Sequence, residues 1–106
     1  MATIIHDVYV QIIRFYLDNG NADSLARAID VELQDWIANC PGFVSASLHI
    51  SEDNKTVINY AQWQDKSAYD EFTRHSNQQQ LSNTIDQFRP DLMESDPFTL
   101  VAQAHA

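Results

Sequence analysis

The sequence is poor in the residues that cross-link a chain or interrupt its secondary structure. Among 106 residues there are one cysteine, two glycines and three prolines. Cys40 alone cannot form an intramolecular disulfide, which is typical of a reducing compartment, so we expect a cytoplasmic protein. Two isolated glycines exclude a glycine-rich phosphate-binding loop. So few glycines and prolines predict long elements joined by few loops.

Basic residues and long apolar runs are also scarce. Six Lys and Arg stand against fifteen Asp and Glu, which gives a formal net charge of −9. Such a surface repels phosphate backbones and anionic headgroups, so we expect no nucleic-acid partner and no binding to a membrane surface. No apolar stretch approaches the ~18 residues of a membrane span. Because no basic region precedes an apolar run at the start, we also expect no signal peptide.

The remaining composition is that of a small globular protein. The chain has a mass of 12.1 kDa, and 44% of its residues are hydrophobic. A chain of this size builds one hydrophobic core, so we predict a single domain over residues 1–106.

The spacing of apolar residues places the elements. Residues 8–17 are apolar on both faces, which is typical of a central strand covered on both sides. Residues 23–39 carry apolar side chains at three- and four-residue spacing, which predicts an amphipathic helix that Asn21 or Asp23 caps and Pro41-Gly42 stops. The other predicted elements are strands at Phe43–Ile50 and Thr56–Trp63, a helix that begins at Asp65 or Ser67 and continues to His75, a second helical stretch through Leu81, Ile85 and Phe88, and a last strand at 97–105.

This β-α-β-β-α-β order predicts an α+β, ferredoxin-like fold, in which an antiparallel sheet carries both helix layers on one face. The other face would still carry large apolar side chains. We therefore expect a second copy to cover it, sheet against sheet, in a homodimer.

One face of the central hairpin has the composition of a binding pocket. With a three-residue turn and a bulge at Asn54, Ser47 lies opposite Asn59 and Ser45 opposite Ala61. Small and hydrogen-bonding side chains then lie between bulky ones, as in a ligand pocket. The predicted pocket face is Phe43, Ser45, Ser47, His49, Val57, Asn59, Ala61 and Trp63. The predicted packing face is Val44, Ala46, Leu48, Ile50, Ile58, Tyr60 and Gln62.

Ordinary structural roles are open for the same residues. An asparagine in a strand is more often solvated than functional, and Trp63 can be a core anchor whose N–H needs an acceptor. His49 can lie at a strand end in solvent, and Tyr69 can place its ring in the core. The remaining histidines show no metal-ligand spacing with one another or with Cys40, so we predict no metal site.

Several segments resemble the antibiotic biosynthesis monooxygenase family. They are Pro41-Gly42-Phe43, Ser45-Ala46-Ser47-Leu48-His49, Asn59-Tyr60-Ala61-Gln62-Trp63 and Ala68-Tyr69, with Gln34-Asp35-Trp36-Ile37 before them. The resemblance covers about 33–72 and extends to the small quinol- and anthrone-oxidising members that tailor aromatic polyketides.

The resemblance implies a dimeric α+β barrel that oxidises an electron-rich phenol, hydroquinone or anthrone with O₂ to a quinone, with no metal, flavin or haem. Asn59, Trp63 and Tyr69 match positions that hydrogen-bond substrate oxygens, and His49 matches a pocket histidine that can accept a proton. We expect the small aromatic substrate to contact further residues as well: Phe43, Ser45, Ser47 and Ala61 of the predicted pocket face, and Phe72.

The sequence also departs from that family. Some members carry an arginine on the second helical stretch, where this chain has Ser82. The residues that haem-degrading relatives need are missing, and Phe72 stands near their tryptophan position, so haem degradation is disfavoured. Two alternatives stay open on the same fold. One is a non-catalytic small-molecule-binding barrel, and the other is an isomerase or lyase with His49 or Tyr69 as acid or base.

Overall fold

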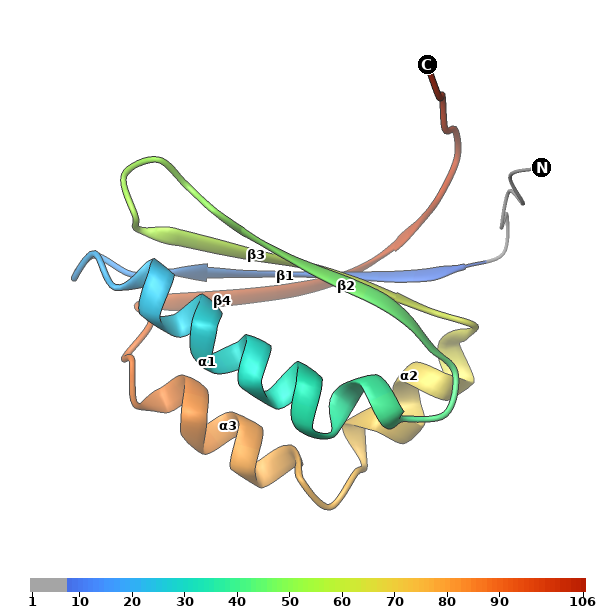
Figure 1. The fold of residues 1–106 in the computed structure, drawn as a ribbon, viewed down its shortest axis with the longest axis horizontal. Coiled ribbons are helices and arrows are strands. Elements are labelled where there is room, and N and C mark those ends of the chain that lie inside the picture. Colours follow the sequence, from blue (N-terminus) through green and yellow to red (C-terminus); the bar gives the residue numbers. More distant parts are fainter. Residues whose placement is uncertain (1–7) are drawn as a thin grey trace.

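The computed structural model describes residues 8–106, which form a four-stranded antiparallel sheet with its helices on one face (Figure 1). The elements are β1 (Tyr9–Tyr16), α1 (Ala22–Asp35), a short 3₁₀ helix η1 (Ile37–Asn39), β2 (Phe43–Ile50), β3 (Thr56–Trp63), α2 (Lys66–Thr73), α3 (Gln78–Asp86) and β4 (Leu92–Thr99). The strand order is β2-β3-β1-β4. This is the predicted ferredoxin-like α+β fold. Within residues 8–106, no helix is long and apolar enough to cross a membrane.

Sequence patterns located the middle of the chain well. β2 and β3 begin and end at the predicted residues, and α2 begins after Asp65, whose carboxylate accepts the Ala68 N–H at 2.8 Å. The first helix ends at Asp35, and the rest of the predicted 23–39 helix is the 3₁₀ helix η1.

The cap of α1 comes from a distant loop, which corrects the predicted caps. Asn21 occupies the N-cap position but makes no side-chain capping bond. Instead Asn54, in the β2–β3 turn, accepts the Asp23 N–H at 2.8 Å and donates to the Gly20 carbonyl at 2.5 Å. One amide thus ties the hairpin to the start of the helix.

The last strand lies earlier in the chain than the predicted 97–105. The N–H of Asp91 donates to the Tyr16 carbonyl at 2.7 Å, and its carboxylate accepts the Asp18 N–H at 2.7 Å, so pairing with β1 starts here. Pro97 lies inside β4. An edge strand tolerates proline where its missing N–H would face solvent, so Pro97 does not mark the start of the strand.

The pairing of β2 with β3 differs by one residue from the predicted register. Leu48 lies opposite Asn59, and Ala46 lies opposite Ala61. Ser51 N–H donates to the Thr56 carbonyl at 3.0 Å, so the turn contains residues 52–55 rather than three residues.

The extra residue of the hairpin is instead accommodated at its other end. The register shifts between Phe43 and Ser45, which returns Phe43 to its predicted place opposite Trp63. Because side chains alternate along a strand, this pairing turns Ser45, Ser47 and His49 toward the opposite face of the sheet, where all three are exposed. Their predicted place on the pocket face is therefore wrong.

The core lies between α1 and the helix-facing side of the sheet. It is built from buried apolar residues of β1, α1, η1 and β3, and its most deeply buried large side chains include Phe15, Leu17, Leu25, Val57 and Trp63. Phe43, Tyr69 and Phe72 pack against this core from β2 and α2. The sheet and α2 therefore meet in a mainly aromatic layer.

The two glycines give a matched test of this packing. Both have positive φ, +76° at Gly20 and +81° at Gly42, but only at Gly42 would a Cβ collide with Ala68 of α2. We expect Gly20→Ala to lower the free energy of unfolding by about 1–2 kcal/mol, the cost of the left-handed conformation. Gly42→Ala should cost clearly more, because α2 must also move. Urea unfolding measures both, and equal losses would contradict the contact between Gly42 and α2.

Candidate functional site

A cavity of about 200 Å³ lies between the helix-facing side of the sheet and the three α-helices. Its apolar walls are formed by Ile13, Phe15, Ile29, Leu33, Ile37, Phe43, Ala46, Ala61, Phe72, Leu81, Ile85 and Met93. Its polar residues are Asn59, Trp63, Tyr69, Thr73, Gln78, Ser82, Asp86 and Ser95. Apolar walls with a few directional polar groups are typical of small-molecule sites.

Aromatic rings form one end of the cavity around Trp63. The Trp63 ring lies 4.9 Å from Phe72, and Phe43 and Tyr69 present their edges at 5.2 and 6.0 Å between ring centroids. Trp63 itself is only 1% exposed. Interlocked rings of this kind hold one another in place and offer a rigid surface to a flat ligand.

Two buried polar atoms at the cavity have no hydrogen-bond partner within residues 8–106. They are the indole Nε1 of Trp63 and the amide Oδ1 of Asn59. Asn59 lies between Ile13 of β1 and Leu48 of β2, which offer its side chain no polar group. A buried polar group left unpaired costs about 1–3 kcal/mol. One donor and one acceptor are therefore left unpaired, within residues 8–106, on side chains that line the cavity.

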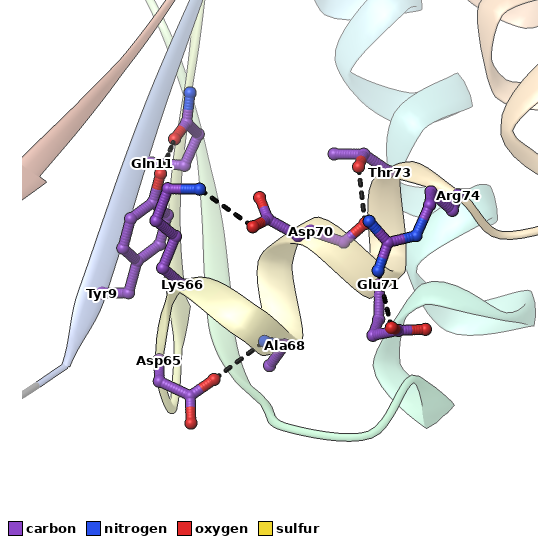
Figure 2. Close-up of polar contacts among 9 residues, drawn as sticks. All are labelled: Tyr9, Gln11, Asp65, Lys66, Ala68, Asp70, Glu71, Thr73 and Arg74. Atoms are coloured by element: carbon purple, nitrogen blue, oxygen red, sulfur yellow. Dashed lines mark hydrogen bonds and ion pairs between the residues drawn. The ribbon is translucent and has the colours of Figure 1, made fainter.

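A third polar side chain at the cavity, Tyr69, packs beside a small hydrogen-bonded network. Tyr69 stacks on Tyr9, with 5.4 Å between the ring centroids. The Tyr9 hydroxyl donates to Gln11 Oε1 at 3.0 Å (Figure 2). Gln11 Nε2 in turn donates to Ser95 Oγ at 2.6 Å. Burial raises the pKa of the Tyr69 phenol, and a hydrogen bond with the Ser95 side chain lowers it by less. Tyr69 is thus a neutral phenol near pH 7 that can donate a hydrogen bond.

The structure gathers some of the sequence-predicted site residues and separates others. Six of them line the cavity: Phe43, Asn59, Ala61, Trp63, Tyr69 and Phe72. Ser45, Ser47 and His49 do not, because the register of β2 turns them outward, and Ala46 lines the cavity in their place. Ser82, which stands where some family members carry an arginine, also lines it.

The sequence did not lead us to Gln11 and Ser95, which form the hydrogen-bonded network beside Tyr69. Gln11 is buried, at 5% exposed, although it is a polar residue between Val10 and Ile12 in an apolar strand. A single polar residue inside an apolar strand was the sequence feature that could have identified Gln11 as a buried, hydrogen-bonded side chain. Ser95 showed no such feature, because it lies ahead of the segment predicted as the last strand. Within the described part of the chain, no group of three or more His, Cys, Asp or Glu could hold a metal ion.

Comparison with known proteins agrees with this architecture. Residues 8–83 match the family model described as antibiotic biosynthesis monooxygenase. A 36-residue segment is 47% identical to tetracenomycin-F1 monooxygenase of Streptomyces glaucescens, and it covers 34% of this chain and 32% of that protein. The matched segment thus spans about a third of the length of that relative.

Two solved structures are similar over nearly their whole length. The ActVA-Orf6 monooxygenase of Streptomyces coelicolor, in complex with nanaomycin D, superposes with a TM-score of 0.84 at 25% identity, over 95% of this chain and 94% of that one. SnoaB, a cofactor-independent oxygenase of Streptomyces nogalater, superposes with a TM-score of 0.78 at 19% identity, over 92% and 96% of the two chains.

Proposed function

Because the chain belongs to the antibiotic biosynthesis monooxygenase family, we propose that it oxidises an electron-rich phenol, hydroquinone or anthrone with O₂, using the substrate itself as the electron donor in place of a cofactor. The observation that carries this proposal is that Trp63 Nε1 and Asn59 Oδ1, on side chains that line an aromatic-walled cavity, have no hydrogen-bond partner within residues 8–106. The similarity to tetracenomycin-F1 monooxygenase and to the ActVA-Orf6 monooxygenase supports the same reaction class.

A phenolic substrate fits the donors and acceptor of the cavity. Its ring would lie against the Trp63 and Phe72 rings, and one substrate oxygen would accept the Trp63 N–H. A substrate hydroxyl would donate to Asn59 Oδ1, while the Tyr69 hydroxyl offers a second donor. Hydrogen bonds from neutral donors favour the ionised phenol, which gives up an electron more readily than the neutral form.

The reaction balances without an outside reductant. An electron passes from the substrate anion to O₂, and the two radicals join to form a peroxide on a substrate carbon. Loss of water then leaves a carbonyl. With an anthrone, the CH₂ group becomes C=O, one oxygen atom enters the product, and the other leaves as water with both hydrogens. The protein's part is to bind, orient and shield the ring while its anion reacts.

The exposed position of His49 changes the expected proton path. The family resemblance implies a pocket histidine as proton acceptor, but His49 lies on the outer face of β2. We therefore assign the substrate proton to solvent at the open side of the cavity, where Ser82 and Asp86 of α3 are exposed. An isomerase or lyase that needs His49 as acid or base loses its support for the same reason.

We also propose that the functional unit is a homodimer. The sheet face opposite the helices carries Ile12, Ile58 and Tyr60, together with Leu92 and Phe98, which are 53% and 42% exposed. Within residues 8–106, no helix covers this face (Figure 1). A second copy with the same apolar face would bury both sheets against each other.

The oxidation proposal predicts which side chains matter. Purified protein incubated with anthrone under air should consume O₂ and form anthraquinone. Trp63→Phe removes the indole donor, and Asn59→Ala removes the amide, so each should lower kcat on the order of a hundredfold. An oxygen electrode and quinone absorbance measure the rates.

His49→Ala and Ser47→Ala are the matched controls, because both residues lie on the outer face of the same strand. Both variants should keep the wild-type rate. Equal rates in the wild type and in Trp63→Phe and Asn59→Ala would contradict the proposed site, as would a wild type that consumes no O₂ with any quinol or anthrone.

The dimer proposal is tested by sedimentation at micromolar concentration. The wild type should sediment near 24 kDa, twice the 12.1 kDa of the chain. Ile58→Glu, on the uncovered sheet face, should give a folded monomer, while Val31→Glu, on an exposed position of α1, should stay dimeric. A monomeric wild type would overturn the proposal.

A further inference from the structure

Among the residues that the structure describes, the cavity is lined by one acidic side chain and by no Lys or Arg. The whole chain contains six basic residues, and none of them lines the cavity. One charged side chain does line it, the carboxylate of Asp86. A fixed anionic group on a ligand would therefore meet no Lys or Arg among the lining residues that the structure describes.

Lys66 of α2 and Arg74, the residue that follows α2, form ion pairs with carboxylates of that helix. Lys66 Nζ lies 2.9 Å from Asp70, and the Arg74 guanidinium lies 2.6 Å from Glu71 (Figure 2). Tyr69 and Phe72 of α2 line the cavity, but these two cations do not, because each is paired with a carboxylate outside it.

The other four cations do not line the cavity either. Arg14 follows the cavity-lining Ile13 in β1 and so projects from the opposite face of the sheet. Arg27 lines a separate groove between α1 and β2. Lys55 lies in the β2–β3 turn, and Arg89 follows α3.

Asp86 is placed to act on a ligand at the cavity. It is the last residue of α3, one turn after Ser82, so both side chains lie on the same face of the helix. Asp86 is exposed and makes no ion pair with residues 8–106, although Arg89 follows it in the same turn and donates its backbone N–H to the Asp86 carbonyl at 3.1 Å. A carboxylate at the C-terminal end of a helix is also repelled by the helix dipole, so helix stability does not account for it.

We propose that this site selects aromatic substrates that carry no carboxylate, sulfonate or phosphate group, and that Asp86 enforces the selection. The neutral donors of Trp63 and Tyr69 can stabilise one oxyanion formed on the ring. A second, fixed negative charge would lose its hydration, meet no cation and face Asp86 in a protein of net charge −9. The inference rests on the proposed function for the identity of the ring substrate.

An isosteric pair of ligands isolates the effect of charge. The probes are 6-hydroxy-2-naphthamide, which is neutral, and 6-hydroxy-2-naphthoate, which is anionic at pH 7.5. Calorimetry on the full chain gives both Kd values without any turnover. We expect the amide to bind about tenfold or more tightly than the carboxylate, because like charges repel across a partly buried site.

Asp86→Asn should shrink this preference several-fold by improving the Kd of the carboxylate while leaving that of the amide unchanged. Asp35→Asn is the matched control, because it changes the net charge equally at an exposed position of α1 that does not line the cavity. It should leave both Kd values unchanged. An equal effect of the two variants would overturn the role of Asp86.

Oxidation of anthrone, measured in parallel, separates the two proposals. Equal Kd values for the two naphthols in an enzyme that still oxidises anthrone would overturn the selectivity alone. A strong preference for the amide in a protein that oxidises no anthrone would support the selectivity and overturn the proposed function. Failure of both ligands to bind at millimolar concentration would overturn the selectivity, and failure to oxidise anthrone as well would overturn both proposals.

Discussion

The pairing of β3 with its two neighbours is the constraint on which the rest of the structure depends. With Asn59 between Ile13 and Leu48, and Trp63 between Tyr9 and Phe43, alternate residues of one central strand carry polar atoms to the helix-facing side of the sheet. The helices complete the enclosure with Tyr69, Phe72 and Leu81. A one-residue slip of β3 would move this whole set to the other face.

The buried polar side chains of the protein divide into those with a hydrogen-bond partner and those without one. Gln11 and Ser95 hold each other, and Trp36 Nε1 donates to the buried Glu32 at 3.0 Å. Trp63 Nε1 and Asn59 Oδ1 have no such partner within residues 8–106. A fold that satisfies one buried indole but leaves the other open keeps that donor available for a ligand, at some cost to stability. This contrast is why we place the chemistry at Trp63 and Asn59.

Local patterns in the sequence were enough to predict β2, β3 and α2, because clean alternation, a glycine and a capping aspartate mark their ends. They also placed Asn59, Ala61 and Trp63 on one face of β3. They failed where a side chain's position depends on strand register or on residues far away in the chain. The longer turn and the bulge beside Phe43 moved Ser45, Ser47 and His49 outward. Likewise, the cap of α1 comes from Asn54, more than thirty residues away in the chain.

The account requires that the indole N–H of Trp63 be free in the unliganded protein and bonded to a ligand oxygen in the complex. The chain contains two tryptophans, so ¹⁵N-resolved NMR of the indole N–H groups, with and without 2-naphthol, measures this directly. We predict a downfield shift of the Trp63 indole proton on binding, while Trp36, held by Glu32, stays in place. An unmoved Trp63 resonance in a protein saturated with the naphthol would contradict the account.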